Sequence, residues 1–487
     1  MKTITVKTEK MLADTLTPVS VYLKIRDVFP KSLLLESNDF HHHENSCSFI
    51  CMSPMAEFIV ADEKIKTRFF NTPNEKEIAN QQQVLTELHE FINSFDIIGN
   101  EYSFNGFFGY CSYNAVRYFE TIAVKKCSDQ SAIPDLYYGL YRFIISFNHF
   151  KNEITLLENI PGSEISQLDK VKRTILNGKI SNYPFEIISD EKSNFTDNQF
   201  VDIVKKAKGH CNRGDVFQVV LSRRFERNYL GDDFNVYRQL RSLNPSPYLF
   251  YFDYGSFRLM GSSPESQIEI KNRKAYINPI AGTYQRTGND EKDKYLAQKL
   301  IEDPKENAEH VMLVDLARND LSRNARNVKV ENFKEIHYYS HVIHIVSKVS
   351  GELTDDSNLV KLMADTFPAG TLTGAPKYKA MQLIDNYEPT SRGFYGGSIG
   401  FIGFNGDVNH AIMIRTMLSK NNTLYYQAGA GIVSKSNEIA ELNEVNHKLG
   451  VVKQAIQKAH VSVNKSQSSI NNLSEPVTSS QTLITNH

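Results

Sequence analysis

The chain has 487 residues, 41% hydrophobic and 23% charged, which is typical of a globular protein with a large core. Its 55 Lys and Arg residues against 56 Asp and Glu residues leave a net charge of −1, which argues against nucleic acid or an anionic membrane as a partner. No apolar run reaches the roughly 18 residues that span a bilayer, and no secretory signal is visible. The length of the chain predicts two or three domains, and the five cysteines, which are few and scattered, fit a reducing compartment and hence a cytoplasmic protein.

The N-terminal region, residues 1–187, is predicted to consist of short strands separated by polar turns. Residues 46–61 and 136–147 are rich in β-branched and aromatic side chains, which favour strands. The polar stretch 188–198 has no sustained period and predicts a linker. Near its end, Thr196 is followed three residues later by a glutamine, the capping-box pattern of a helix N-terminus.

The second part of the chain, residues 196–460, holds the concentrated Gly, Glu and His signals. Strand-like runs lie close together at 219–225, 248–260 and 266–280, without a regular alternation of strands and helices. This pattern favours an α+β fold with largely antiparallel sheets over a doubly wound parallel fold. The tail, residues 462–487, is rich in Ser, Asn and Thr and is predicted to be disordered.

Two acidic residues share a helix face with apolar residues in the segment 302–320. Asp303 can cap this helix, and at about 100° per residue Glu306 and Glu309 then lie on the face of the leucines that follow. A buried carboxylate without a partner is costly, so a cation, a metal or a proton should compensate it. Glu306 is equally well explained as a capping-box residue, whereas Glu309 favours a metal or active-site role.

A second acidic helix is predicted over 436–456. Its core stripe at helical spacing consists of Ile439, Leu442, Leu449 and Ile456. Beside that stripe lie Glu441, Glu444 and Lys448, which in an isolated helix would form a solvated face with a Glu444–Lys448 ion pair. Two Glu-x-x-Glu helices in one domain instead predict a site of oxygen ligands that suits Mg²⁺ and disfavours zinc or copper.

Three glycine clusters, at 367–377, 392–401 and 427–434, flank β-type segments and fit no nucleotide-binding motif. They can form tight turns at positive φ, or they can expose backbone N–H groups to a small carboxylate. Arg415 is either a surface residue of a strand-like run or the fork that holds a second carboxylate. His344 lies in an apolar strand-like run and is either structural or a general base.

These motifs together resemble those of the chorismate-utilising enzymes, and in particular the anthranilate synthase component I group. In chain order, the matching segments are SSPE (262–265), PIAGT (279–283), ENAEHVMLVDLARND (306–320), IHIVS (343–347), AGTLTGAPK (369–377), RGFYGGSIGF (392–401), IMIRT (412–416) and QAGAGIV (427–433). The resemblance implies an α+β fold of packed, largely antiparallel β-sheets surrounded by helices, with the site in a cleft. It implies that chorismate and ammonia are converted to anthranilate and pyruvate, the first committed step of L-tryptophan biosynthesis.

The resemblance also implies a role for each matching residue. Glu309 and Glu444 would ligate Mg²⁺, and Glu306 and Glu441 would support the metal through water. The residues that would bind or line the substrate are Gly282, Thr283, Tyr395, Arg415, Gly429, Ala430, Gly431 and Lys448. Glu265 would be the acid for the departing ring hydroxyl, and His344, positioned by Thr371, would remove the C2 proton.

Two positions separate this chain from other members of the family. Ala281 stands where aminodeoxychorismate synthases carry a nucleophilic lysine, and Gln218 stands where isochorismate synthases carry a lysine that activates water. Neither side chain can perform that chemistry, so external ammonia is the expected nucleophile. An aminodeoxyisochorismate-type or aminodeoxychorismate synthase and a non-catalytic tryptophan-binding regulator remain alternatives.

Regulation and a partner are implied by the resemblance as well. Segments 32–39 and 244–252 resemble the two halves of the family's tryptophan-sensing site, although a polar turn and a Pro-rich turn explain them equally well. The implied L-tryptophan ligands are Glu36, Ser37, Pro247, Tyr248 and Leu249. No Gly-x-Cys-x-Gly turn of a glutaminase occurs. Ammonia would therefore come from a separate glutamine amidotransferase subunit, component II, in a hetero-oligomer.

Overall fold

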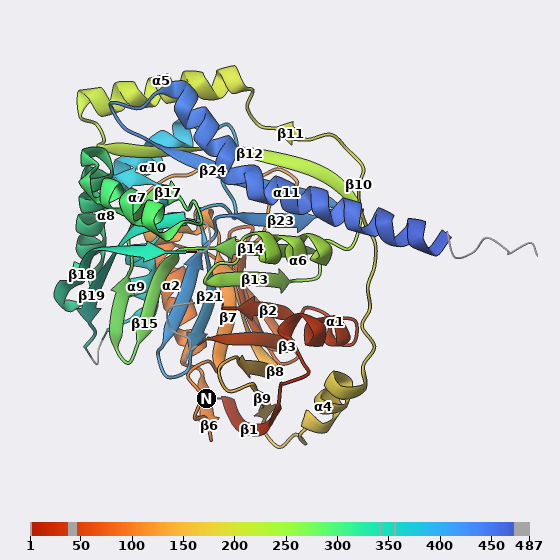
Figure 1. Ribbon diagram of the computed structural model, residues 1–487. Coiled ribbons are helices and arrows are strands. Elements are labelled where there is room, and N and C mark those ends of the chain that lie inside the picture. Colours follow the sequence, from red (N-terminus) through yellow and green to blue (C-terminus); the bar gives the residue numbers. More distant parts are fainter. Residues whose placement is uncertain (1, 38–45, 340–341, 355–356, 472–487) are drawn as a thin grey trace, which may run out of the picture.

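The computed structural model describes residues 2–37, 46–339, 342–354 and 357–471 (Figure 1). Its helices are α1 (Pro18–Ile25), α2 (Gln81–Ile92), α3 (Val116–Phe119), α4 (Leu168–Asn177), α5 (Asp197–Arg213), α6 (Phe234–Leu243), α7 (Asp290–Glu302), α8 (Pro304–Ser322), α9 (Leu359–Thr366), α10 (Lys377–Tyr387) and α11 (Glu438–Asn471), with short 3-10 turns η2 (Tyr113–Ala115) and η3 (Gly370–Leu372). None of these helices is long and apolar enough to cross a membrane.

The strands of the first half are β1 (Lys2–Leu12), β2 (Leu33–Glu36), β3 (Cys47–Ala61), β4 (Lys64–Phe69), β5 (Thr72–Glu77), β6 (Phe95–Ile98), β7 (Gly106–Cys111), β8 (Leu136–Asn148), β9 (Glu153–Pro161), β10 (Phe185–Ile187), β11 (Lys192–Ser193) and β12 (Gln218–Gly231). Those of the second half are β13 (Tyr248–Asp253), β14 (Phe257–Ser263), β15 (Ser266–Lys271), β16 (Lys274–Ile277), β17 (Ile280–Gln285), β18 (Arg326–Tyr338), β19 (Val342–Glu352), β20 (Gly374–Ala375), β21 (Ser398–Gly403), β22 (Val408–Ile412), β23 (Thr416–Lys420) and β24 (Thr423–Ile432).

Two antiparallel sheets form the body of the molecule and join at β8, which pairs with β3 and with β7. One sheet runs through β3, β2, β13, β14, β23, β24 and β12. The other runs through β7, β21, β22, β15, β16 and β19. A parallel pair, β1 with β6, lies at the N-terminal edge. The predicted α+β class with largely antiparallel sheets is therefore confirmed.

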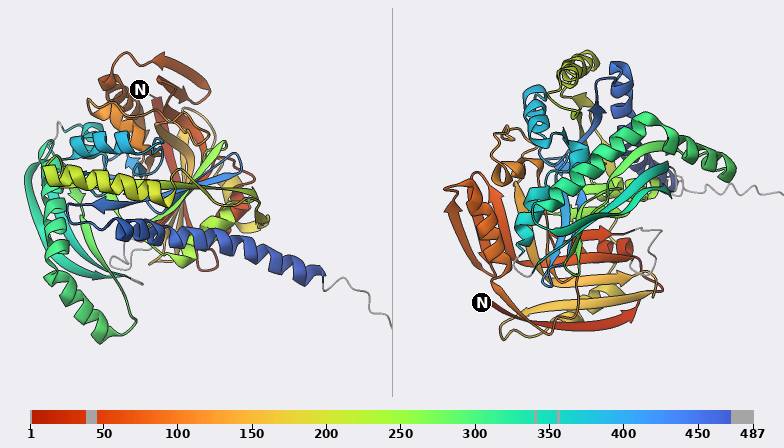
Figure 2. Two further views of the ribbon diagram at one scale, coloured as in Figure 1. Left: turned by 90° about the horizontal axis from the view of Figure 1, so that it is seen from above. Right: turned by 90° about the vertical axis from the view of Figure 1, so that its left-hand side faces the viewer.

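The alternation of side chains along the strands places one apolar layer between the two sheets and one on each outer face. Phe250 and Leu418 of the first sheet and Ile399 of the second belong to the inner layer. The outer face of the first sheet packs against α1, α4, α5, α6, α10 and α11, and that of the second against α2, α3, α8 and α9. Figure 2 shows the strands in the middle of the molecule with helices around them.

Local signals in the sequence set the helix starts correctly. Thr196 accepts a hydrogen bond from the backbone of Gln199, whose side chain bonds back, so the predicted capping box is present. The Asp303 carboxylate accepts from the backbone N–H groups of Lys305 and Glu306 at the start of α8. These caps satisfy N–H groups that the helix leaves unpaired.

Two details of α11 differ from the sequence prediction. Ile439, predicted in the core stripe, is 55% exposed because it lies in the first turn, whereas Leu442, Leu449 and Ile456 are buried. The helix continues to Asn471, into the segment predicted to be disordered, because no Gly or Pro interrupts it there. The rest of that predicted tail, residues 472–487, lies outside the described residues.

Strands from the two predicted domains share both sheets. In the first sheet β2 pairs with β13, and in the second β7 pairs with β21. The division of the chain at residues 188–198 therefore stays a prediction. It does not coincide with a boundary between the two sheets. This pairing matters for the site, because segments from both halves support it.

Candidate active site

The two predicted acid–base residues lie near one arginine. Glu265 follows β14, and its Oε1 accepts a hydrogen bond from the hydroxyl of Thr371 in η3 at 2.9 Å. Burial raises the pKa of Glu265 to about 7, although Thr371, Lys448 and Arg415 each act to lower it. A carboxyl group with such a pKa is partly protonated at neutral pH and can donate a proton.

His344 lies in β19 with 7% of its surface exposed, and its Nδ1 is 2.8 Å from the carbonyl oxygen of Gly282. Because a carbonyl can only accept, Nδ1 carries the hydrogen and Nε2 keeps its lone pair. Burial, aided by the positive charge of Arg415 and opposed by the hydrogen bond to Gly282, lowers the pKa of His344 to about 4. Thr371 was predicted to position His344. In the structure, the hydroxyl of Thr371 instead donates its hydrogen bond to Glu265.

The strand β17 carries a bulge at Gly282, between the ladder positions of Ala281 and Thr283. Gly282 has φ +64°, and a Cβ there would lie 2.8 Å from Leu300 and 3.3 Å from Oε2 of Glu306. Only glycine fits this position without strain. The backbone of Thr283 lies opposite His344 in the β17–β19 ladder.

Arg415 lies in the connection between β22 and β23 rather than in a strand, with φ +48°. Such a conformation is unusual for arginine and occurs mostly where the surroundings impose it. Its Nη1 is 3.4 Å from Oδ1 of Asn244. Burial lowers the pKa of Arg415, and the neighbouring Glu265 opposes that effect. The guanidinium is therefore a cation whose charge is only partly compensated by protein groups.

The glycine cluster 427–434 lies largely in β24, not in a turn. Its ladder with β23 ends at Tyr426, so the following backbone edge is not covered by β23. The Nζ of Lys448 donates to the carbonyl of Gly429 at 2.9 Å. A Cβ on Gly429 would lie 3.1 Å from the hydroxyl of Tyr395, so the buried tyrosine ring lies directly against the cluster. Ala430, by contrast, is fully buried in the core under α11.

The four predicted acidic residues come from two helices, and the charge of a glutamate on one helix affects a glutamate on the other. Glu306 and Glu309 lie on α8, and Glu441 and Glu444 lie on α11. Burial raises the pKa of Glu306, and the negative charges of Glu309 and Glu444 raise it further. Burial and Glu444 likewise raise the pKa of Glu441. Carboxylates that raise each other's pKa need a compensating cation.

Two of these carboxylates already have protein partners. Oε1 of Glu309 accepts from Nε2 of Gln218 at 3.0 Å, and Oε1 of Glu444 pairs with Nζ of Lys448 at 2.7 Å. Glu441 has a buried Oε2 without a hydrogen-bond partner. In the described residues, no three His, Cys, Asp or Glu side chains are close enough as they stand to hold a metal ion. The orphaned oxygen and the hard ligand type nevertheless fit a divalent cation such as Mg²⁺.

Comparison with known proteins decides the family. A family model described as chorismate binding enzyme matches residues 31–454. The chain belongs to this family. It is 36% identical over 479 residues to anthranilate synthase component 1 of Aquifex aeolicus (strain VF5), covering 93% of this chain and 94% of that protein. The resemblance drawn from the motifs is thereby confirmed.

Two solved structures have the same fold as this chorismate binding enzyme. Anthranilate synthase component I from Streptococcus pneumoniae TIGR4 has a TM-score of 0.72 at 30% identity, covering 91% of this chain and 99% of that one. The menaquinone-specific isochorismate synthase from Escherichia coli also has a TM-score of 0.72, at 17% identity, covering 93% and 95%. The second likeness establishes the fold alone.

The residues predicted to sense tryptophan are also brought together in this chorismate binding enzyme. Glu36 and Leu249 are register partners in the β2–β13 ladder, which places Ser37 near Pro247 and Tyr248. The buried Glu36 carboxylate accepts from the Tyr237 hydroxyl at 2.6 Å and from Nε of Arg241 at 2.8 Å. Sequence reasoning missed both partners because they lie on α6, about 200 positions along the chain.

Sequence reasoning also missed an ion pair between Glu388 and Arg392. Both side chains are almost fully buried, with 3% and 1% exposed, and Oε1 of Glu388 is 2.7 Å from Nη2 of Arg392. The i, i+4 spacing was visible next to the motif RGFYGGSIGF, but that pattern usually marks an exposed helix face. Only the fold reveals that this pair is internal.

Proposed function

We propose that this enzyme converts chorismate and ammonia to anthranilate and pyruvate. The observation that carries the proposal is the environment of Arg415, where a carboxyl group with a pKa of about 7 and a neutral imidazole both experience the arginine's charge. The pKa of the carboxyl group lies above that of the imidazole, which is the reverse of the usual order. At neutral pH the carboxyl group can therefore donate a proton while the imidazole is neutral and can accept one, which suits two successive proton transfers. The similarity to anthranilate synthase component 1 along most of the chain supports the same assignment.

In the first step, ammonia forms a bond to C2 of the ring while the C4 hydroxyl departs, and Glu265 supplies the proton that releases it as water. In the second step, His344 removes the C2 proton through Nε2. The electron pair of that C–H bond completes the aromatic ring, the C3–O bond breaks, and the departing enolpyruvate takes up a proton at its methylene carbon to become pyruvate. Arg415, Tyr395 and the backbone edge of β24 would hold the enolpyruvyl carboxylate.

Mg²⁺ would be held by Glu309 and Glu444, with Glu306 and Glu441 supporting it through water. When bound, the ion would supply positive charge for the ring carboxylate of chorismate. The protein residues contribute independently of it: Gln218 orients Glu309, and Lys448 orients Glu444. The amide of Gln218 is no base, which argues against the water-activating chemistry of an isochorismate synthase.

We further propose that a glutamine amidotransferase subunit supplies the ammonia, because no glutaminase motif occurs in this sequence. L-tryptophan would inhibit the enzyme by binding at Ser37 and the 247–249 segment. Residues 196–460 would form the chorismate-binding part, and residues 1–187 would carry part of the regulatory site. All five cysteines are free thiols, which fits the proposed cytoplasmic location.

The test uses the purified full chain with chorismate, an ammonium salt and MgCl₂. Anthranilate is followed by its blue fluorescence, and pyruvate by coupling to lactate dehydrogenase. We expect equal amounts of the two products with ammonium, and none with glutamine alone. Release of water and an aminated product without pyruvate would favour a synthase that stops at the intermediate. If chorismate is not consumed, the proposal fails.

A further inference from the structure

The internal ion pair Glu388–Arg392 lies beneath the candidate active site and contacts several of its segments. Oε2 of Glu388 also accepts from Nε of Arg392 at 3.0 Å, so the contact is bidentate. This arrangement holds both planar groups in one orientation, which a single contact cannot do. None of the proposed chemical steps uses either residue.

Arg392 also donates two hydrogen bonds to backbone carbonyls. Nη1 donates to the carbonyl of Leu372 at 2.6 Å, and Nη2 donates to the carbonyl of Val220 at 2.7 Å. Leu372 is the neighbour of Thr371 in η3, and Val220 lies in β12 two residues after Gln218. The guanidinium therefore ties together the segments that carry the hydroxyl partner of Glu265 and the amide partner of Glu309.

Arg392 also lies against Tyr395, with its guanidinium 5.5 Å from the ring centroid. Tyr395 in turn contacts the position of Gly429 in β24. On the other side of the pair, Oε1 of Glu388 accepts from both the backbone N–H and the hydroxyl of Ser222, at 2.8 and 2.7 Å. Ser222 is the register partner of Gly429 in the β12–β24 ladder.

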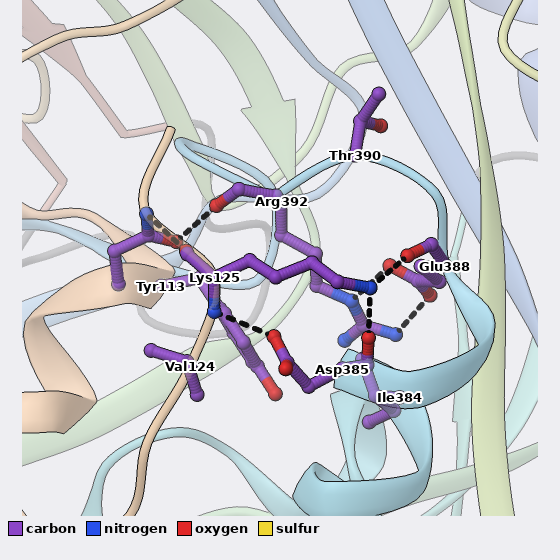
Figure 3. Close-up of a pocket in the computed structure, with 10 residues that line it drawn as sticks. Tyr113, Val124, Lys125, Ile384, Asp385, Glu388, Thr390 and Arg392 are labelled. Atoms are coloured by element: carbon purple, nitrogen blue, oxygen red, sulfur yellow. Dashed lines mark hydrogen bonds and ion pairs between the residues drawn. The ribbon is translucent and has the colours of Figure 1, made fainter. Parts of the chain in front are cut away.

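A lysine from the N-terminal region fixes the same segment from outside. Figure 3 shows the ammonium of Lys125 directed at the end of α10, beside the ion pair. Its Nζ donates to the carbonyl of Glu388 at 2.8 Å and to that of Asp385, while its backbone N–H donates to Oδ1 of Asp385 at 2.7 Å. The position of the ion pair is thus set by both halves of the chain.

We infer that Glu388 and Arg392 are positioning residues that set the geometry of the chorismate site by joining η3, β12, β24 and Tyr395 through one buried ion pair. This inference rests on the proposed function, since the affected property is the binding of chorismate. Tyr395 and the β24 edge would contact the substrate carboxylate both before the reaction and in the transition state. Displacing them therefore weakens the binding of bound chorismate and of the transition state by the same amount. Loss of such uniform binding raises KM more than it lowers kcat.

The test compares Arg392→Lys with wild type in the full chain. Lysine keeps the positive charge but cannot span Glu388 and both carbonyls. We expect the KM for chorismate to rise at least about tenfold, with a smaller change in kcat. Glu388→Gln should raise the KM for chorismate less than Glu388→Ala does, because the amide oxygen of glutamine can still accept from Ser222.

The matched control is Arg142→Lys, which alters another ion pair of a buried glutamate, Arg142–Glu158 on β8 and β9, with a 3.0 Å contact. Both arginine variants should lower the melting temperature, but a merely structural defect reduces the active fraction and leaves KM unchanged. If Arg392→Lys does not fold, Ser222→Ala removes one donor to Glu388 without leaving a charge unpaired and should still raise KM, about threefold.

The inference is overturned if folded Arg392→Lys, or Ser222→Ala in its place, keeps the wild-type KM, or if Arg142→Lys raises KM equally. Failure of the proposed function looks different, because wild-type protein itself would then produce no anthranilate. Measuring wild type first separates the two outcomes.

Discussion

The hydroxyl of Thr371 donates to Oε1 of Glu265 across 2.9 Å, and this bond joins η3 to the residues between β14 and β15. The hydroxyl stabilises the ionised carboxylate, whereas burial favours the protonated form and dominates. The balance leaves the pKa of Glu265 at about 7. A small change at Thr371 should therefore change the protonation of Glu265 in the range where cells operate.

We expect kcat/KM for chorismate to fall as pH rises through about 7, because Glu265 then loses the proton that releases the ring hydroxyl. Glu265→Gln should lower kcat by about 10²–10³-fold and remove this alkaline limb. Thr371→Val should move the limb to higher pH, since the ionised form loses its hydrogen-bond donor. The measurement is kcat/KM for chorismate against pH for all three proteins. Retention of the limb in Glu265→Gln would assign it to another group.

His344 provides a second test, of the base. Asn at this position can still donate to the Gly282 carbonyl, but it has no lone pair in place of Nε2. We expect His344→Asn to fold normally and to lose about 10²–10³-fold in kcat. Because burial lowers the pKa of His344 to about 4, the acid limb of wild-type kcat/KM should have its midpoint near that pH. A decline already near the ordinary pKa of histidine, about 6.5, would contradict the neutral, buried state described here.

Local sequence signals were sufficient for the parts of this site that lie on one helix. The caps at Thr196 and Asp303 and the Glu306–Glu309 stripe follow from spacing alone, and the structure contains them. Antiparallel sheets could be predicted as well, because several strand-like runs follow one another without helices between them. Ile439 was misplaced because periodicity does not reveal that the first turn of a helix is exposed.

Contacts between distant segments were not predictable from those signals. Gln218 meets Glu309 only because β12 and α8 converge in the fold, and Ser222 meets Glu388 for the same kind of reason. Arg415 looked like a strand residue, but its backbone lies between two strands with positive φ. Such placements depend on sheet topology, which a single sequence specifies only through its whole set of packing interactions.

The proposed metal site predicts a binding defect that does not depend on turnover. Glu309→Gln replaces a charged oxygen with a neutral amide, so the affinity for Mg²⁺ should fall by about 10–100-fold. Isothermal titration with MgCl₂ measures this directly, in the absence of chorismate. Asp315→Asn on the same helix is the control, because Asp315 is exposed and pairs only with Arg318 among the contacts described. Equal affinities in all three proteins would place the metal elsewhere.

The proposed tryptophan site predicts a variant that separates inhibition from catalysis. Ser37→Ala removes one hydroxyl beside the β2–β13 ladder, so the concentration of L-tryptophan for half inhibition should rise about tenfold. Turnover without tryptophan should stay within about twofold, since the backbone of Ser37 keeps its contact with Ser46. Ser46→Ala is the neighbouring control and should change inhibition less. Loss of uninhibited turnover in Ser37→Ala would make the site structural.

Gly431 and Gln218 offer a double-mutant test of the carboxylate geometry. A Cβ on Gly431 would lie 2.3 Å from Nε2 of Gln218, the atom that donates to Glu309. Gly431→Ala should therefore push the amide off Glu309 and weaken Mg²⁺ binding, while the flexible glutamine spares the fold. Gln218→Ala should weaken Mg²⁺ binding by a similar factor, about tenfold. Because both changes act through one hydrogen bond, the double variant should be no weaker than Gln218→Ala alone. Additive losses, measured by the same titration, would mean that Gly431 acts on the site independently of Gln218.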